Sequence, residues 1–480
     1  MRPHIIIRYI GLIFLFNSLF LFISFCISLL NKDSAIFPLM YATIVAFIFG
    51  IFPIIYVPPA KNISSKEGFL IVVLSWMLTC LLGVIPYIMW GGEFTFTNAW
   101  FESVSGYTTT GSTILNDIES LPKGLLFWRA STHWIGGIGI IIFALVVLPN
   151  IGHARAVLLN TEFSSLAKSN FLYNSKQVIH ILLIVYVGLT LLETIALSMA
   201  GMSFFDAVSH SFATIATGGF SPKNSSIAHY NNLSIEIIIM IFMLLSGIHF
   251  GLLFNTILGR KKNIFRSSIV RYYFFSILIG VIIVAANLYS NGYYNLFNSI
   301  RFSAFQVISL GTTTGFATID SAIWPHFSIM ILLFLTLQCA MAGSTSGGIK
   351  VDRFFIFLKS IKNQIKRFHH PNAVLSLKID KKSLDNNLIS NVIIFILIYI
   401  FIVFISAVIL TSLGVDGITA FSASAATMGN VGPGFGGVSS LGNYAAIPEL
   451  GKWVLSANMI LGRLEIYAVI SLFMVKTWRF

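Results

Sequence analysis

The stretch that decides the fold is GYTTTGST, from Gly106 to Thr113, a polar segment set in strongly apolar sequence. Comparable segments recur three times: ATIATGGFS (213–221), LGTTTGFAT (310–318) and TMGNVGPG (427–434). Alignment on a central glycine pairs Gly111 with Gly218, Gly315 and Gly432, at spacings of 107, 97 and 117 residues by subtraction. A nearly constant period indicates four copies of one structural unit.

Composition places the chain in a membrane. It is 56% hydrophobic and 10% charged, with a mean hydropathy of +0.87, whereas soluble domains are roughly 25% charged. Runs such as Ile10 to Leu30 and Ile237 to Leu253 are about as long as a membrane-spanning helix. The first run lacks a clear cleavage site, so we expect no cleavable signal. Cys26, Cys80 and Cys339 lie in apolar runs, which predicts neither disulfides nor a metal site.

The formal charge of +13 is concentrated in segments that alternate with the repeated loops. These segments are the N-terminus (Arg2, Arg8), Lys61 and Lys66, the stretch from Gly152 to Lys176, RKKNIFR (260–266), the stretch from Lys359 to Lys382, and the C-terminus (Lys476, Arg479). Because Lys and Arg favour the cytoplasmic side, we expect both termini in the cytoplasm and the loops open to the outside.

These constraints predict an all-α polytopic membrane protein with about ten spans. Two helices come first, followed by four units that each contain a span, a short re-entrant helix with its loop, and a second span. The expected spans are 9–30, 36–57, 69–90, 127–150, 179–200, 235–258, 272–289, 328–357, 388–413 and 452–475. Each unit starts and ends in the cytoplasm, so the units are parallel repeats around a pseudo-fourfold central pore, unlike the inverted repeats of many transporters.

The corresponding organisation of the chain has five parts. They are residues 1–66 (two extra N-terminal transmembrane helices), 67–175 (repeat 1), 176–268 (repeat 2), 269–384 (repeat 3) and 385–480 (repeat 4).

The loop chemistry favours a cation filter. Non-helical backbone at membrane depth is tolerated where it is buried or lines a water-filled path, and rings of backbone carbonyls replace the hydration shell of potassium in its channels. Glycine adopts the positive φ that such a loop needs. The predicted filter residues are Thr110, Gly111, Thr217, Gly218, Thr314, Gly315, Val431 and Gly432. The alternative is helix packing through small residues, which four matched loops make much less favoured.

A second feature interrupts the apolar run from Ser328 to Phe357. The interruption, AGSTSGGIK (342–350), disfavours a continuous helix and supplies polar groups for a cavity. We interpret it as an intramembrane gate loop made of Gly343, Ser344, Thr345, Ser346, Gly347, Gly348 and Lys350. A packing kink that does not move is the alternative.

A third feature is Arg463, which lies about 16 Å along its helix from Lys452 at 1.5 Å per residue, near mid-membrane. A charge at that depth usually faces a cavity or a partner. We interpret Arg463 as an electrostatic barrier below the filter, with a structural ion pair to an acid such as Glu193 as the alternative. Glu102, Asp206 and Asp416 flank the re-entrant helices and would either concentrate cations at the mouth or cap helices.

The motifs carry a family resemblance. TTTGST, ATGGFS, TTTGF and NVGPG, together with GSTSGGIK (343–350) and LGRLE (461–465), resemble the Trk/Ktr/HKT superfamily of potassium transporters. The two extra N-terminal spans resemble the bacterial TrkH-type branch, and the resemblance covers nearly the whole chain. It implies a potassium-uptake subunit of the bacterial inner membrane whose filter glycines match Gly111, Gly218, Gly315 and Gly432.

The resemblance also implies partners. Members of this type form homodimers and dock a cytosolic, nucleotide-binding regulatory ring (TrkA-like), so a nucleotide would bind another polypeptide. By its charge alone, the basic stretch from Lys359 to Lys382 would contact membrane lipid or an acidic partner, and solvation under the positive-inside rule is the alternative that explains most of its charge. We expect no nucleic acid partner and no organic cofactor in this chain, with potassium as the transported ion.

Three function classes remain. The first is channel-like potassium uptake driven mainly by membrane potential. The second is symport of potassium with sodium or protons, for which the buried acid Glu193 is the hint. The third, an intramembrane enzyme, is disfavoured because no nucleophile, base and orienting group recur together.

Overall fold

The computed structural model describes residues 2–60, 65–147, 175–260, 263–372, 375–380, 382–464 and 466. Most of the basic stretch from Gly152 to Lys176, and Lys61, Lys476 and Arg479, lie outside the described residues. The same is true of Glu465 and of the end of the last expected span.

The described chain is helical, apart from one short antiparallel ribbon. Its helices are α1 (Pro3–Asn31), α2 (Ile36–Tyr56), α3 (Ser65–Trp90), α4 (Phe96–Tyr107), α5 (Lys123–Val147), α8 (Ser175–Met199), α9 (Phe204–Ile215), α10 (Leu233–Ser246), α11 (Phe250–Ile257), α12 (Ser268–Ser290), α13 (Leu296–Gly311), α14 (His326–Gln338), α15 (Val351–His369), α16 (Asn386–Ser412), α17 (Gly417–Gly429) and α18 (Glu449–Leu464). Short 3-10 turns are η2 (Ser226–Tyr230), η3 (Ile264–Arg266), η4 (Ser321–Ile323) and η5 (Gly436–Val438). In the ribbon of β1 (Lys378–Ile379) and β2 (Lys382–Ser383), Lys378 lies opposite Ser383.

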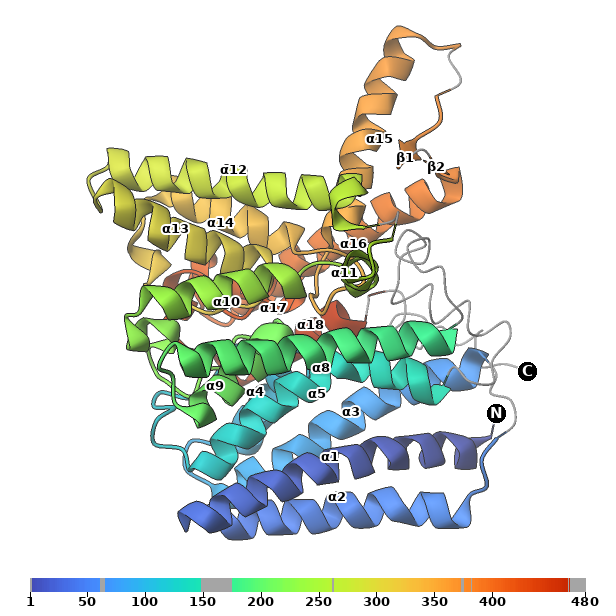
Figure 1. The fold of residues 1–480 in the computed structure, drawn as a ribbon, viewed down its shortest axis with the longest axis vertical. Helices are drawn as coiled ribbons and strands as arrows, with labels where there is room; N and C mark the ends of the chain where they lie inside the picture. The colour runs from blue at the N-terminus through green and yellow to red at the C-terminus, as the bar shows by residue number, and fades with distance from the viewer. Residues whose placement is uncertain are drawn as a thin grey trace.

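The long helices form a membrane-spanning body. Among the described residues, six helices are long and apolar enough to cross a bilayer: α1, α2, the part of α3 from Leu70, the part of α8 from His180, α12 and α16. In Figure 1, α1, α2, α8 and α12 run nearly parallel, whereas α15 extends away from the body at a steep angle to them. This arrangement agrees with the predicted helical membrane protein.

A long helix followed by a short one recurs four times, as predicted from the loop spacing. The short helices α4, α9, α13 and α17 pack against the long helices that precede them, α3, α8, α12 and α16. Each short helix begins at a side-chain cap that accepts a hydrogen bond from the backbone N–H three residues later. The four caps are Thr95, Ser203, Asn295 and Asp416. Asp416 is therefore a helix cap, one of its two predicted roles.

Two of the expected second spans are not continuous helices. The expected span over 235–258 is bent, because α10 and α11 meet at an angle of 104°. A Cβ atom on Gly247, at this bend, would lie 2.5 Å from the hydroxyl of Tyr273, so the neighbouring helix approaches too closely for a side chain there. The predicted interruption of the span over 328–357 lies between α14 and α15.

The N-terminal hairpin α1–α2 packs on the first unit, against α3 and α5. Buried Tyr107, at the end of α4, donates a hydrogen bond to Asn17 of α1 over 2.7 Å. The hairpin therefore supports the point where α4 passes into its loop.

Candidate ion-binding site

The four loops share one backbone conformation. Each has two residues with positive φ, separated by one residue. These pairs are Thr109 (54°) and Gly111 (83°), Thr217 (54°) and Gly219 (80°), Thr313 (62°) and Gly315 (80°), and Asn430 (53°) and Gly432 (99°). The shared pattern gives an alignment of the loops that is independent of residue type.

This alignment corrects the second loop by one residue. Gly219, and not Gly218, is equivalent to Gly111, Gly315 and Gly432. The motif ATGG has two adjacent glycines. Matching its Thr217-Gly218 pair to the Thr-Gly pairs of loops 1 and 3 selects Gly218 instead of Gly219. The cap residues carry the missing signal: counted from the cap, the central glycine is 16 residues on in repeats 1, 2 and 4 once Gly219 is used.

The four central glycines close a ring. A Cβ atom built on Gly111 would lie 2.0 Å from the carbonyl oxygen of Gly218 in the second loop. The same relation holds from Gly219 to the oxygen of Thr314 (2.1 Å), from Gly315 to that of Val431 (2.2 Å) and from Gly432 to that of Thr110 (2.5 Å). Each glycine therefore touches the carbonyl of the residue before the next glycine, and a side chain at any of the four positions would collide with backbone.

A cavity of about 60 Å³ lies at this ring and is lined by all four central glycines. Its other lining is mostly polar, including Ser112, Thr113, Ser221, Asn224 and Ser226, with the basic residues Arg129 and Lys223. The loops thus meet at one polar space, which connects segments more than 300 residues apart in the chain.

The ring offers oxygen atoms in a buried setting. The hydroxyls of Thr108 and Thr110 lie 2.8 Å apart, and those of Thr312 and Thr314 lie 2.9 Å apart, so loops 1 and 3 have matching side-chain contacts. The C-terminal ends of α4, α9, α13 and α17 lead directly into the loops, and this end of a helix carries partial negative charge. Carbonyl oxygens and helix C-termini together favour a cation.

Each short helix also fastens the far side of its loop with a polar side chain. His210 contacts the hydroxyl of Ser221 at 3.0 Å, and Gln306 donates to the carbonyl of Ile319 at 2.6 Å. Ser422 both accepts from the N–H of Phe435 and donates to its carbonyl. In the first unit Glu102 has this role, because its carboxylate accepts a hydrogen bond from the N–H of Ile114 at 3.0 Å. Glu102 is neither a cap nor a residue of the open mouth, because it is fully buried.

The segment between α14 and α15, which contains the predicted gate residues, lies against the fourth loop and the end of α9. A Cβ atom on Gly347 would lie 2.4 Å from the side-chain oxygen of Asn430, and one on Gly348 would lie 2.2 Å from the sulfur of Cys339. The hydroxyl of Thr345 donates to the carbonyl of Ile215 over 2.9 Å. Of the other predicted gate residues, the hydroxyls of Ser344 and Ser346 lie 3.1 Å apart, and Lys350 is the buried residue that precedes α15.

The same segment exchanges backbone hydrogen bonds with the bend between α10 and α11. Met341 donates to the carbonyl of Gly247, and Phe250 donates to the carbonyl of Gly343, both over 3.1 Å. Gly343 has a φ of 84°, and a Cβ atom there would lie 2.5 Å from the ring of His249. Two interrupted helices therefore satisfy part of each other's backbone, as non-helical backbone in a membrane requires.

Arg463 of α18 is buried and reaches two other elements. Its guanidinium donates to the carbonyl of Thr345 in the interrupted segment and to the carbonyl of Gly136 in α5, the latter over 2.9 Å. It lies 5.9 Å from the centre of the Trp76 ring. Among the described residues, ion pairs join Arg2 to Glu67, Arg129 to Glu102 and Arg301 to Glu236, and none joins Glu193 to Arg463.

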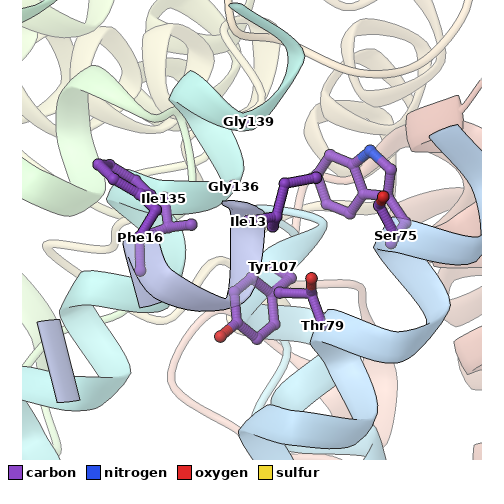
Figure 2. Close-up of a pocket in the computed structure, with 9 residues that line it drawn as sticks. Ile13, Phe16, Ser75, Thr79, Tyr107, Ile135, Gly136 and Gly139 are labelled. Carbon is purple, nitrogen blue, oxygen red and sulfur yellow. The ribbon is translucent and has the colours of Figure 1, made fainter. Parts of the chain in front are cut away.

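A cavity of about 40 Å³ adjoins these contacts, behind the first loop. Figure 2 shows Ile13 and Phe16, Ser75 and Thr79, and Tyr107 around it, with Gly136 and Gly139 on the helix beside it. Its lining joins α1, α3, the end of α4 and α5, and it includes Trp76. Gly136, whose carbonyl accepts a hydrogen bond from Arg463, therefore also lines this cavity.

Several site residues carried no usable sequence signal. Asn430 was not predicted, although its amide donates to the hydroxyl of Thr110 at 3.0 Å and to the carbonyl of Met459 at 2.9 Å. Arg129 was missed because it stands in an apolar helix with no motif around it. The cap spacing could have found Gly219, but only the packing of loops against one another identifies Asn430 and Arg129.

Comparison with known proteins relates the chain to transporters over its whole length. A family model described as TrkH, cation transport protein, matches residues 37–478. The chain is 36% identical to the Trk system potassium uptake protein TrkH of Escherichia coli (strain K12), with 99% of each chain covered. It is 34% identical to the TrkH of Halomonas elongata, with 100% of each covered.

A solved structure agrees with the fold. The crystal structure of the potassium transporter TrkH from Vibrio parahaemolyticus superimposes with a TM-score of 0.90 at 31% sequence identity, covering 100% of both chains. The helical membrane architecture is therefore shared along the full length of this chain.

Proposed function

The chain belongs to the TrkH family of cation transport proteins, and we propose that it takes up potassium through the ring of four loops. The family is one of transporters and not of enzymes. One observation carries the proposal: four central glycines at φ of 80° to 99° each contact a carbonyl oxygen of the next loop, around one polar cavity. Potassium as the ion rests on the relatives named above, which are potassium uptake proteins.

In this proposal the four loops form the selectivity filter of a central pore, and the four units are parallel repeats around it. The filter residues are Thr110, Gly111, Gly218, Gly219, Thr314, Gly315, Val431 and Gly432, with Thr217 at the turn into the second loop. One positive-φ glycine per loop makes this filter simpler than that of potassium channels, so we expect weaker exclusion of sodium.

The segment from Gly343 to Lys350 serves as the gate below the filter, and Arg463 supplies positive charge beside it. Support comes from the hydrogen bond of Arg463 to Thr345 and from the contact of Gly347 with Asn430. A cytosolic nucleotide-binding ring of the TrkA type would control the gate in a homodimer at the bacterial inner membrane, with both termini in the cytoplasm. The basic character of α15, with Lys366, Arg367 and His369 in its last turn, suits a cytoplasmic position.

The test is the reversal potential of the purified chain in liposomes, with potassium, sodium and pH gradients imposed separately. A potential that follows the potassium gradient is the expected result. A potential that ignores potassium would refute the proposal.

Coupled symport with sodium or protons is the second candidate, because Glu193 is a fully buried acid on α8. It predicts that the reversal potential shifts with sodium or pH at fixed potassium, and that Glu193→Gln removes that shift. An unchanged potential under both gradients would exclude it.

A further inference from the structure

The first two loops are joined by a buried ion pair. Arg129 of α5 donates through Nε to Oε1 of Glu102 of α4 over 2.6 Å. The side chain of Glu102 is 0% exposed and that of Arg129 is 2% exposed. A charge pair so far from water is stable only with good geometry and further hydrogen bonds, and removing one partner is strongly destabilising.

Both side chains also form hydrogen bonds with residues of the loops. Glu102 accepts from the hydroxyl of Thr113 at 3.0 and 3.1 Å, and from the N–H of Ile114. Arg129 donates through Nη1 to the carbonyl of Ser221 at 3.0 Å. Thr113 and Ile114 follow the central glycine of the first loop, and Ser221 follows that of the second.

The guanidinium also lies flat on the second loop. The Cζ atom of Arg129 is 3.5 Å from the centre of the Phe220 ring, which stacks on its other partner, the ring of His133, at 4.0 Å. Phe220 directly follows Gly219, and Gly218 touches Gly111. The pair therefore sets the distance between the two loops on either side of the first ring contact.

The other three loops have no equivalent charge. His210 and Gln306 stand nine residues before their central glycines, as Glu102 does, and Ser422 stands ten residues before Gly432. These three described side chains fasten their own loops through hydrogen bonds to Ser221, Ile319 and Phe435. The side chain that fastens the loop is therefore part of an ion pair in the first unit and of no ion pair among the described residues of the other three.

We propose that Glu102 and Arg129 are positioning residues that determine ion discrimination by fixing loop 1 against loop 2. This inference rests on the proposed filter. A carbonyl ring discriminates between cations by the placement and number of its oxygens, so a looser first contact admits the smaller sodium ion more readily. Neither residue is offered as an ion ligand.

The test replaces Glu102 by glutamine in the full chain and measures the potassium-to-sodium permeability ratio from reversal potentials in liposomes. Glu102→Gln retains size and an acceptor for Ile114 but removes the charge that holds Arg129. We expect the ratio to fall on the order of threefold, equivalent to about 0.7 kcal/mol.

The chain offers a matched control in the pair Arg301–Glu236, which joins α13 to α10 by two bonds of 2.7 Å. Glu236 is 2% exposed and Arg301 is 17% exposed, and among the described hydrogen bonds their side chains bond to each other and not to one of the four loops. Glu236→Gln removes a similar bond and should lower thermal stability while leaving the permeability ratio unchanged.

A double variant separates position from charge. Glu102→Gln alone leaves the positive charge of Arg129 without its partner, and Arg129→Gln in addition removes that charge. A purely electrostatic effect on conductance should then disappear, whereas the lowered potassium-to-sodium permeability ratio should persist. Thr113→Val, a milder change that removes one hydroxyl donor to Glu102, should shift the ratio in the same direction by less, and it decides the matter if Glu102→Gln does not fold.

The outcomes are distinct from those of the function test. A wild-type chain that ignores the potassium gradient would overturn both proposals. A selective wild type with an unchanged ratio in folded Glu102→Gln, or in Thr113→Val where the former does not fold, would overturn only this inference. An equal fall in the ratio for Glu236→Gln would also overturn it, since the effect would then be general loss of structure.

Discussion

At the residue scale, the ring depends on glycines that have no room for a methyl group. Gly219 has a φ of 80°, and a Cβ atom there would lie 2.1 Å from the carbonyl oxygen of Thr314. Positive φ alone is a modest cost for alanine, on the order of 1–2 kcal/mol. The collision with backbone adds to that cost and moves the neighbouring loop.

Gly219→Ala should therefore reduce potassium uptake by about tenfold or more, since overpacking of this kind costs roughly 1–3 kcal/mol. Uptake by cells that depend on this chain, corrected for the amount of protein in the membrane, measures it. Gly201→Ala is the control, because Gly201 has a φ of 98° but nothing within 4 Å of its Cβ position. Equal uptake by the two variants would contradict the assignment of Gly219 to the ring.

Lys223 places a positive charge where cations would gather. It lines the cavity at the ring, and its neighbour Asn224 donates hydrogen bonds to two acids of the first unit, Asp117 and Glu119. Lys223→Gln should raise potassium conductance at low ionic strength, because the charge repels the ion. The gain should shrink as salt increases, since the Debye length falls from about 30 Å at 0.01 M to about 3 Å at 1 M.

The control for Lys223 is Lys366→Gln, which neutralises an exposed lysine of α15 far along the chain. Its conductance should match the wild type at every ionic strength. A gain in Lys223→Gln that does not depend on salt would indicate altered packing instead of repulsion.

Sequence alone predicted the residue types of the site but not all of its positions. The Thr-Gly pairs of loops 1 and 3 and the Val-Gly pair of loop 4 predict a glycine that has positive φ, whereas the double glycine of the second loop shifted its alignment by one, from Gly219 to Gly218. The backbone dihedral angles decide between the two, and residue identity does not report them when both candidates are glycine.

At the scale of elements, Arg463 ties α18 to the interrupted segment and to α5. We expect Arg463→Gln to raise potassium conductance, because it removes a positive charge beside the proposed path and releases the carbonyl of Thr345. Single-channel or flux measurements in liposomes test this expectation. Lower protein yield with no rise in conductance per folded molecule would favour a structural role.

The matched control is Lys452→Gln. Lys452 is a second buried basic residue of α18, and it donates over 2.8 Å to the side chain of Asn98 in α4 instead of to the interrupted segment. Its removal should leave conductance close to that of the wild type.

The helices that the sequence predicts best are those that coincide with long, uninterrupted apolar runs. Long apolar runs predicted the ends of α2 and α16 to within two residues and those of α12 to within four, whereas α1 begins six residues before the expected span. The bend between α10 and α11 was not predictable, because Ser246, Gly247 and Ile248 are ordinary residues of a membrane helix. At the bend, Gly247 lies close to the hydroxyl of Tyr273, and its carbonyl accepts a hydrogen bond from Met341. Both are contacts between distant parts of the chain.

At the scale of the whole molecule, the first unit alone is supported by an added helical hairpin. Tyr107→Phe removes the bond to Asn17 and leaves a buried amide oxygen without that donor. We expect the free energy of unfolding to fall by about 1–3 kcal/mol, with the permeability ratio unchanged. Thermal unfolding in detergent and reversal potentials measure the two quantities.

Tyr289→Phe is the control for this substitution, since Tyr289 is 55% exposed on α12. It should leave the unfolding temperature unchanged. A Tyr107→Phe chain as stable as the wild type would show that the hairpin adds little to the first unit through this bond.

The ring contacts run from loop 1 to 2, 2 to 3, 3 to 4 and back to 1, so three of the four contacts join loops that are consecutive in the chain. Tandem duplication of an ancestral unit could build such an assembly without crossed connections. An assembly of four identical subunits must accept every mutation four times, whereas this chain acquires each one singly. Its quarters are therefore free to diverge, and the pair of Glu102 and Arg129 in the first quarter is one such divergence.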